Sequence, residues 1–258
     1  MKEKKVVLIT GASSGIGLAT AQYFVSKGHT VYGVARREYT GGDFTCFSAD
    51  ITDYAAMQGV LEEIVKREGR LDVLINNAGF GIAGAMEEAC AENISRIVEV
   101  NLTALCVLCG KAIPFMKDRG GRIINISSVG GIMPLPYQAM YSATKAGVEV
   151  FSRALANEVK DYKIKVSAVL PGDTKTGFTQ ARVTEGQNAR ARKSINKMAH
   201  DEQHGKSPVS VAKVVYRCSV KRRPPLRVSV GGLSKLEVFL SRLVSVKFLN
   251  KILCKMYG

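Results

Sequence analysis

The fold is decided by a stretch near the start of the chain, Lys5-Val6-Val7-Leu8-Ile9-Thr10-Gly11-Ala12-Ser13-Ser14-Gly15-Ile16-Gly17. Its first half is an apolar run typical of a buried strand, and a helical pattern begins directly after the last glycine. Such a turn brings backbone N–H groups and a helix N-terminus to a diphosphate, and glycines are needed because a Cβ atom would block the approach. The residues expected to form this site are Gly11, Ser13, Ser14, Gly15, Ile16 and Gly17.

The glycine spacing, Gly-x3-Gly-x-Gly, differs from the Gly-x-Gly-x-x-Gly fingerprint and from a P-loop, which requires a Gly-Lys-Ser/Thr ending. Strand-like apolar runs recur along the rest of the chain, at residues 30–35, 73–76, 122–127, 165–170 and 226–230, with room for helices between them. The runs are nearly continuous in Val, Ile and Leu, as in parallel strands that helices cover on both faces. We therefore expect an α/β protein with a doubly wound parallel sheet (a Rossmann fold) in one domain, residues 1–258.

Two regions depart from this rhythm. Residues 177–209 are polar and basic without a strand period, and their position between the last two strands predicts a lid over a substrate. Residues 233–257 carry apolar side chains every three or four positions, which predicts one or two amphipathic helices. These helices could cover the pocket, pack on a partner subunit or lie on an anionic membrane surface. Packing is the favoured interpretation, and the basic residues leave peripheral membrane attachment open.

The chain has 258 residues, of which 46% are hydrophobic, and a formal net charge of +15 that is concentrated in its second half. We find no apolar run of roughly 18 residues that would span a membrane and no signal-peptide core, so we expect a soluble, cytoplasmic protein. The six cysteines form no regular framework and are expected to be reduced, packed thiols. No nucleic-acid motif accompanies the positive charge, so we expect no nucleic-acid partner.

Two arginines, Arg36 and Arg37, end the second predicted strand, about 20 residues after the glycines, where an acidic residue would normally hold the 2'-hydroxyl of NAD. Guanidinium groups suit a 2'-phosphate because they donate bidentate, charge-assisted hydrogen bonds. We therefore expect NADP(H) as the cofactor. A solvated basic turn is the alternative, and the neighbouring Glu38 weakens the signal.

Five motifs together resemble the short-chain dehydrogenase/reductase family: residues 10–17, residues 76–79 (Asn-Asn-Ala-Gly), Asn101, Ser128 and Tyr141-x3-Lys145. They occur in the family's order and spacing, and the resemblance covers residues 5 to about 176. It implies that Asp50 and Ile51 contact adenine. It also implies that Asn77, Ala78 and Gly79 contact the cofactor and brace the central sheet beside the adenosine ribose. At the nicotinamide end it implies contacts from Pro171, Gly172, Thr174 and Thr176.

Tyr141 and Lys145 lie one helical turn apart and share a face. A surface pair is the simplest interpretation, but Lys145, helped by a cationic nicotinamide, could lower the pKa of the phenol and make it an acid/base catalyst. Ser128 ends a predicted strand at the edge where ligands bind, and its hydroxyl could donate to a substrate oxygen. Ser127 competes for that role, and the family interval to the tyrosine selects Ser128.

Asn101 precedes an apolar helix and could simply cap it; in the family, the matching residue helps hold a water that relays protons to the lysine. The resemblance thus implies an NADP(H)-dependent oxidoreductase that interconverts a ketone or aldehyde and an alcohol, with a dimer or tetramer as the expected homo-oligomer. In the reductive direction, hydride reaches the carbonyl carbon while Tyr141 protonates the oxygen. A non-catalytic NADP(H)-sensing regulator of the same fold is the alternative.

Apolar residues point to a small lipophilic substrate, and the resemblance to one branch of the family implies a substrate such as a hydroxysteroid. Residues 133–137 are expected to form one wall of the pocket, and Phe178, Val183, Ile195 and Met198 of the lid another. The tail also resembles the branch of the family that handles steroids and retinoids. His200 and His204 share a helical face, but hydride transfer needs no metal, and we expect none to be bound.

Overall fold

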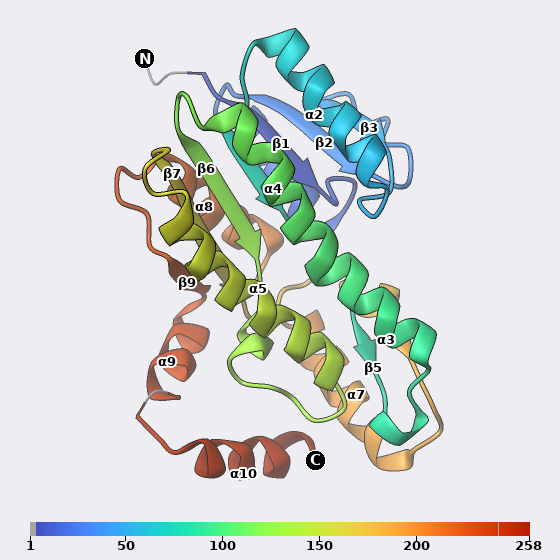
Figure 1. Cartoon of the computed structure of the whole chain (residues 1–258). Coiled ribbons are helices and arrows are strands. Elements are labelled where there is room, and N and C mark those ends of the chain that lie inside the picture. The colour runs from blue at the N-terminus through green and yellow to red at the C-terminus, as the bar shows by residue number, and fades with distance from the viewer. Residues whose placement is uncertain (1–3, 242) are drawn as a thin grey trace.

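The computed structural model describes residues 4–241 and 243–258 and shows a parallel sheet of seven strands between two layers of helices (Figure 1). The strand order is β3-β2-β1-β4-β6-β7-β9, and every neighbouring pair is parallel. The strands are β1 (Val6–Thr10), β2 (Thr30–Ala35), β3 (Thr45–Ser48), β4 (Val73–Asn76), β6 (Gly121–Ile126), β7 (Ile164–Pro171) and β9 (Arg227–Val230). This is the doubly wound sheet that the sequence predicts.

The alternation of side chains along β1 explains why helices cover both faces of the sheet. Val6 and Leu8 pack into one core with the helices α2 (Tyr54–Glu68), α4 (Ala104–Met116) and α5 (Ala139–Glu158). Val7 and Ile9 point the other way, into a second core that includes α1 (Gly15–Val25) and α8 (Pro208–Val220). Because successive side chains of a strand face opposite sides, a continuous apolar run fills both cores.

Each predicted strand is present, and the structure has three further strands that were not predicted. The edge strand β3 is short, and its side chains are half-buried or exposed, so it has no apolar run to reveal it. The strands β5 (Ile82–Ala83) and β8 (Val183–Thr184) form a separate two-stranded sheet. Residues so far apart in the sequence cannot be paired from local pattern.

The segment predicted as a lid, residues 177–209, is mostly helical. It contains α6 (Phe178–Ala181), β8 and α7 (Ala189–Gln203), and its last residues begin α8. Asn188 caps α7 by accepting hydrogen bonds from the amides of Arg190 and Ala191. The polar composition reflects the exposed face of α7, not a lack of secondary structure.

The C-terminal region forms two helices, α9 (Gly232–Leu240) and α10 (Val246–Tyr257). Ser245 starts the second helix, because its hydroxyl accepts a hydrogen bond from the amide of Phe248. Both helices lie on the side of the sheet where the strands end, and α10 lies farthest from it (Figure 1).

A continuous helical stretch, Ala91–Met116, is long and apolar enough to cross a membrane by length and composition alone. It comprises α3 (Ala91–Val98), a π-helical segment η2 (Glu99–Thr103) and α4. Its side chains at Leu105, Leu108 and Cys109 pack into the core beneath the sheet, as in the core helix of a globular fold. Burial raises the pKa of Cys109 and raises that of Cys106 to about 11, which keeps both thiols protonated and disfavours redox chemistry there.

Candidate active site

A pocket of about 1080 Å³ lies at the carboxyl ends of the strands, where ligands bind in open α/β sheets. Except for Gly17 and Asn101, all the site residues predicted from the sequence line this one pocket. Gly17 and Asn101 instead lie directly behind lining residues, as described below. The structure therefore gathers into one place residues that are spread over more than half of the chain.

The glycine turn is shaped to hold an anion. Gly11 and Gly15 have φ angles of 67° and 55°, a region that side chains disfavour. A Cβ atom on Gly17 would clash with the carbonyl group of Gly11, so this glycine allows α1 to pack against the turn. The N-cap residue Ser14 makes no side-chain hydrogen bond to α1, and the first turn of that helix contains no acidic residue. Its N-terminal amides therefore fit the diphosphate of a dinucleotide.

Asn77 braces this turn against the neighbouring strand. Its side-chain amide donates to the carbonyl oxygens of Thr10 and Gly11, at 3.0 and 3.3 Å. In return, the Thr10 hydroxyl accepts hydrogen bonds from the backbone amides of Asn77 and Ala78, both at 3.0 Å. The bracing that the family resemblance implies for residues 77–79 is thus present as direct hydrogen bonds.

Arg36 and Arg37 are exposed at the end of β2 and line the pocket, in the position expected for contacts to a 2'-phosphate. Asp50 and Ile51 line the same part of the pocket. Burial alone would raise the pKa of Asp50, but hydrogen bonds from Thr52 and the charge of Arg36 hold it below its ordinary value. Asp50 is therefore an ionised acceptor near the arginines.

Ser128 and Ser127 have different roles in the structure. Ser127 is buried, and its hydroxyl donates to the carbonyl oxygen of Lys145 at 2.6 Å, which ties β6 to α5. Ser128 lines the pocket and accepts a hydrogen bond from the amide of Gly130 at 3.1 Å. The Ser128 hydroxyl is also hydrogen-bonded with the Tyr141 side chain, so the two hydroxyl groups meet in the pocket. Donation from Ser128 to a substrate oxygen stays a prediction.

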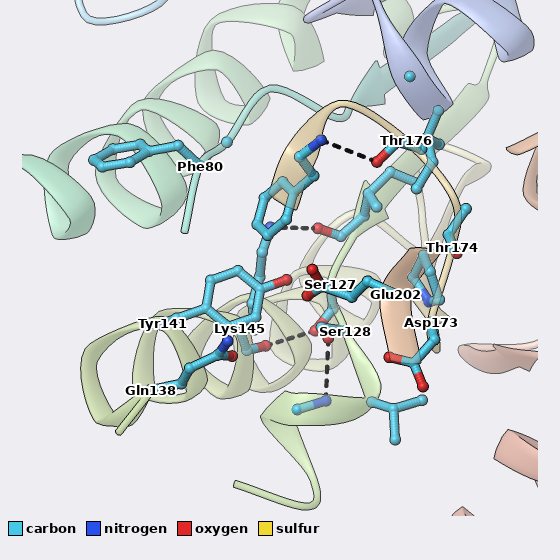
Figure 2. A pocket seen from close by; sticks show the side chains of 18 of the residues that line it. Phe80, Ser127, Ser128, Gln138, Tyr141, Lys145, Asp173, Thr174, Thr176 and Glu202 are labelled. Carbon is cyan, nitrogen blue, oxygen red and sulfur yellow. Dashed lines mark hydrogen bonds between the residues drawn. The ribbon is translucent and has the colours of Figure 1, made fainter. Parts of the chain in front are cut away.

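Tyr141 projects from α5 with its hydroxyl directed toward Ser128 and Glu202 (Figure 2). Burial raises the pKa of the phenol, the hydrogen bond with Ser128 opposes this, and the charge of Glu202 adds to the rise. From the sequence we expected Lys145, helped by a cationic nicotinamide, to lower this pKa. In the chain without a cofactor the pKa of Tyr141 is not lowered, because burial is the largest influence on it and Lys145 is not among its causes.

Lys145 lies beneath the tyrosine ring, with its Nζ atom 5.9 Å from the ring centroid. The Nζ atom donates to the carbonyl oxygen of Ile126 at 3.0 Å. The side chain is buried, and burial lowers its pKa to about 8. An ammonium group placed here still has donor capacity toward the pocket, which fits the ribose contact that the resemblance implies.

Asn101 is fully buried in the π-helical segment η2. It does not cap a helix, because its side chain bonds both the amide and the carbonyl of Phe80, at 3.0 and 2.9 Å. A Cβ atom added to Gly79 would lie 2.9 Å from Asn101 Oδ1 and 3.5 Å from Lys145 Nζ. The asparagine and the lysine therefore border the same small space, so the proton relay stays a prediction that the geometry allows.

Pro171, Gly172, Thr174 and Thr176 form the opposite rim of the pocket, at the end of β7. The Thr174 hydroxyl donates to the carbonyl of Gly172 at 2.8 Å, and the Thr176 hydroxyl accepts from the amide of Phe178 at 3.2 Å. These bonds fix the segment that carries the residues predicted to contact the nicotinamide.

An ion pair between Arg182 and Glu202 was not predicted from the sequence. Glu202 lines the pocket and also accepts from the Thr179 hydroxyl at 2.5 Å. The guanidinium of Arg182 is almost fully buried, and its Nε atom has no hydrogen-bond partner among the described residues. The two residues come from different elements, and no spacing in the sequence links them.

The apolar walls differ from the predicted ones. Met133 and Leu135 line the pocket, as do Phe178 and Val183. Within residues 133–137, Pro134, Pro136 and Tyr137 do not line it, and neither do Ile195 and Met198 of the predicted lid. Those last two pack with Ala83 and Ala85 in a small third core, because the apolar face of α7 turns inward onto β5. A wall that the sequence left open comes from the C-terminal region, in Leu240, Val244, Phe248, Leu249, Ile252, Leu253, Met256 and Tyr257.

His200 and His204 lie side by side on α7, with ring centroids 4.2 Å apart, and His204 Nδ1 faces the carbonyl oxygen of His200 at 2.8 Å. Within the part of the chain that the structure describes, no three His, Cys, Asp or Glu side chains are grouped to hold a metal ion.

The chain belongs to the short-chain dehydrogenase family, whose model, described as short chain dehydrogenase, matches residues 5–187. A curated relative from Bacteroides thetaiotaomicron, named 3-ketodihydrosphingosine reductase, is 42% identical over 243 residues, which cover 90% of this chain and 89% of the relative.

Two solved structures extend the likeness. A short-chain dehydrogenase from Streptomyces avermitilis matches with a TM-score of 0.86 and 32% identity, over 99% of this chain and 97% of that one. A 3-ketoacyl-(acyl-carrier-protein) reductase from Brucella melitensis, complexed with NADH, matches with a TM-score of 0.77 and 29% identity, over 90% of this chain and 99% of that one. The chain is therefore an oxidoreductase of this family.

Proposed function

We propose that this protein reduces a ketone within a long-chain lipid to an alcohol, with NADPH as the reductant. The observation that carries the proposal is the position of the Ser128, Tyr141 and Lys145 side chains in a pocket whose outer wall is apolar and comes from the C-terminal region. A polar reaction centre with an apolar extension suits a substrate that has one carbonyl group and a hydrocarbon chain.

The groups at the base of the pocket account for the proton chemistry. Bound NADPH supplies a hydride to the carbonyl carbon. Tyr141 gives its phenolic proton to the carbonyl oxygen, and Ser128 donates a hydrogen bond that holds this oxygen as negative charge develops. The raised pKa of Tyr141 keeps the phenol protonated at neutral pH, which is the form that reduction requires. Lys145 would hold the nicotinamide ribose.

The substrate class follows from the relative and from the polar pair in the pocket wall. 3-Ketodihydrosphingosine is a long-chain ketone with an amino group on the carbon next to the carbonyl. The Glu202 carboxylate, close enough to Tyr141 to influence its pKa, offers an acceptor for an ammonium group at that carbon. We therefore favour an acyclic amino ketone over the hydroxysteroid expected from the sequence.

The choice of NADPH rests on Arg36 and Arg37. A related structure contains NADH, so the fold itself does not exclude the cofactor without a 2'-phosphate. Two exposed guanidinium groups at the end of β2 favour the phosphorylated form, because each can donate to the phosphate.

A turnover screen tests the proposal. NADPH oxidation is followed with 3-ketodihydrosphingosine, a long-chain 3-ketone without the amino group, a 3-ketosteroid and a 3-oxoacyl thioester, and repeated with Tyr141→Phe. We expect the amino ketone to give the highest kcat/KM, and we expect Tyr141→Phe to lose it by about a thousandfold while it still binds NADPH. Preference for the steroid would refute the substrate class. Binding of NADPH without turnover of any ketone would favour the regulator.

A further inference from the structure

Large apolar side chains are exposed mainly at the C-terminal end of the protein. Within the described residues, eight of the thirteen exposed large hydrophobic residues lie between positions 236 and 256. Leu243 and Val246 are 67% and 75% exposed. We call this set the C-terminal apolar face; its members are Leu236, Phe239, Leu240, Leu243, Val246, Phe248, Ile252 and Met256. Large exposed apolar side chains that are concentrated in one region of a protein indicate an interaction site.

The C-terminal apolar face is also the rim of the pocket. Leu240, Phe248, Ile252 and Met256 are exposed to solvent and at the same time line the pocket. A molecule that covered this face would therefore lie directly over the entrance to the Tyr141 site. Whatever binds to the C-terminal apolar face therefore also affects how substrate reaches the pocket.

The segment that carries this face is also positively charged. Residues 232–258 contain five basic residues and one acidic residue. Lys235, Lys247, Lys251 and Lys255 are all exposed. The charge continues onto α7, where Lys197 donates to the carbonyl oxygen of Met256 and so holds the neighbouring helix. A second copy of this chain would bring an equally positive surface, and the two would repel each other across a two-fold contact.

We propose that the C-terminal apolar face docks on the surface of an anionic phospholipid bilayer. The twelve residues of α10 are too few to span a membrane, so the helix lies in the interface with its apolar side chains among the acyl chains. The lysines bind the negative headgroups around it. In this orientation the pocket opens into the bilayer, and a lipid can enter without crossing water.

Co-sedimentation with vesicles tests the docking and does not depend on the identity of the substrate. The full chain is mixed with phosphatidylcholine vesicles, with or without a fraction of phosphatidylglycerol. We expect it to sediment with the anionic vesicles, to bind neutral ones more weakly, and to be released in part by high salt. Failure of the wild-type chain to bind anionic vesicles would overturn the proposal.

Two double variants locate the surface without touching the pocket. Leu243→Asp with Val246→Asp removes apolar contact, and Lys247→Glu with Lys251→Glu reverses two charges. None of these four residues lines the pocket. Each double variant should weaken binding to anionic vesicles by at least about tenfold.

Matched controls change exposed residues on other surfaces. Val209→Asp, at the start of α8, is the control for the loss of apolar contact. Lys160→Glu with Lys213→Glu is the control for the charge reversal. We expect the controls to bind as the wild type does. Circular dichroism checks that every variant folds, and light scattering gives its oligomeric state. Equal losses in the control variants would refute the assignment of the surface. The proposal would also be refuted if the wild type formed oligomers and the double variant Leu243→Asp with Val246→Asp dissociated them. The C-terminal apolar face would then be a contact between copies of the chain.

Discussion

Burial acts in opposite directions on the two titratable groups at the base of the pocket. It raises the pKa of Tyr141, whose neutral form is favoured when water is excluded, and it lowers the pKa of Lys145 to about 8 for the same reason. At pH 7 the phenol is therefore protonated and the lysine is still charged. This is the combination of protonation states that reduction of a carbonyl needs.

The pH dependence of the reductive kcat/KM follows from these shifts. A base with a lowered pKa is charged below that value and neutral above it, so Lys145 loses its charge as the pH rises through about 8. We expect kcat/KM to be flat at lower pH and to fall through this region, since kcat/KM reports groups of the free enzyme. A fluorescence titration of NADPH on Tyr141→Phe should show weaker binding over the same range. A profile that stays flat to about pH 10 would contradict the assignment to Lys145.

Glu202 gives a second prediction at this scale. Glu202→Gln keeps a side chain that can accept from Arg182 and share a hydrogen bond with Thr179, but it removes the negative charge. We expect kcat/KM for the long-chain amino ketone to fall about tenfold, with little change for the matched ketone that lacks the amino group. Equal losses for both ketones would show that Glu202 only shapes the pocket.

The site residues differ in how visible they are in the sequence. Those on the glycine turn, at Ser128 and on the first turns of α5 could be predicted, because short spacings within single segments fix their relation. Arg182 and Glu202 could not, since they meet only after the segment between β7 and α8 has folded. Only the ion pair in the folded structure shows that the two residues belong to the same site.

At the scale of elements, buried strands were predicted well and exposed ones were not. The sequence shows β1, β2, β4, β6, β7 and β9 as apolar runs because helices cover them on both faces. The edge strand β3 lacks that burial, and β5 and β8 pair over about 100 residues, as in the register Ile82 with Val183. The segment expected to form a lid, residues 177–209, showed no strand period, and its polar composition comes from exposed helices such as α7, which are polar on one side.

The packing of α1 on the glycine turn can be tested with one substitution. In Gly17→Ala, the added Cβ atom would meet the backbone of Gly11 and the amide of Asn77, neither of which can move easily. We expect the free energy of unfolding to fall by about 1–3 kcal/mol and the affinity for NADPH to fall with it. Thermal or urea unfolding measures the first, and fluorescence titration the second.

Gly59→Ala in the middle of α2 is the matched control. Nothing lies within 4 Å of the position where its Cβ atom would be built. Alanine there should raise stability by about 0.5–1 kcal/mol, because glycine costs more entropy in a helix. If the two variants changed stability alike, close packing at Gly17 would not be the reason for its glycine.

At the scale of the whole molecule, charge and hydrophobicity are distributed unevenly, as the sequence suggested. The cofactor half of the sheet ends in Arg36 and Arg37, and the substrate side is bordered by α7 and α10, which carry exposed basic residues. The sequence predicted an amphipathic C-terminal segment but left open whether it covers the pocket, a subunit or a membrane. The structure shows that it lines the pocket. A dimer or tetramer, and a cytoplasmic location, stay predictions; light scattering and cell fractionation measure them.

The response of the global fold to the cofactor gives the last prediction. A ligand that binds only the native state adds about 2.7 kcal/mol of stability at a hundred times its Kd. For a chain of 258 residues, this corresponds to a rise of about 5–10 °C in Tm. We expect NADPH to give such a rise in the wild type and in Tyr141→Phe, because the phenolic hydroxyl acts in proton transfer and is not needed for the fold. Arg36→Ala with Arg37→Ala should lose most of the rise with NADPH while its response to NADH stays unchanged, since the 2'-phosphate is the part of the cofactor that we expect the two guanidinium groups to contact. If NADPH and NADH raised the Tm equally, both in the wild type and in this double variant, the argument for NADPH would be removed. The catalytic assignment of Tyr141 would not be affected.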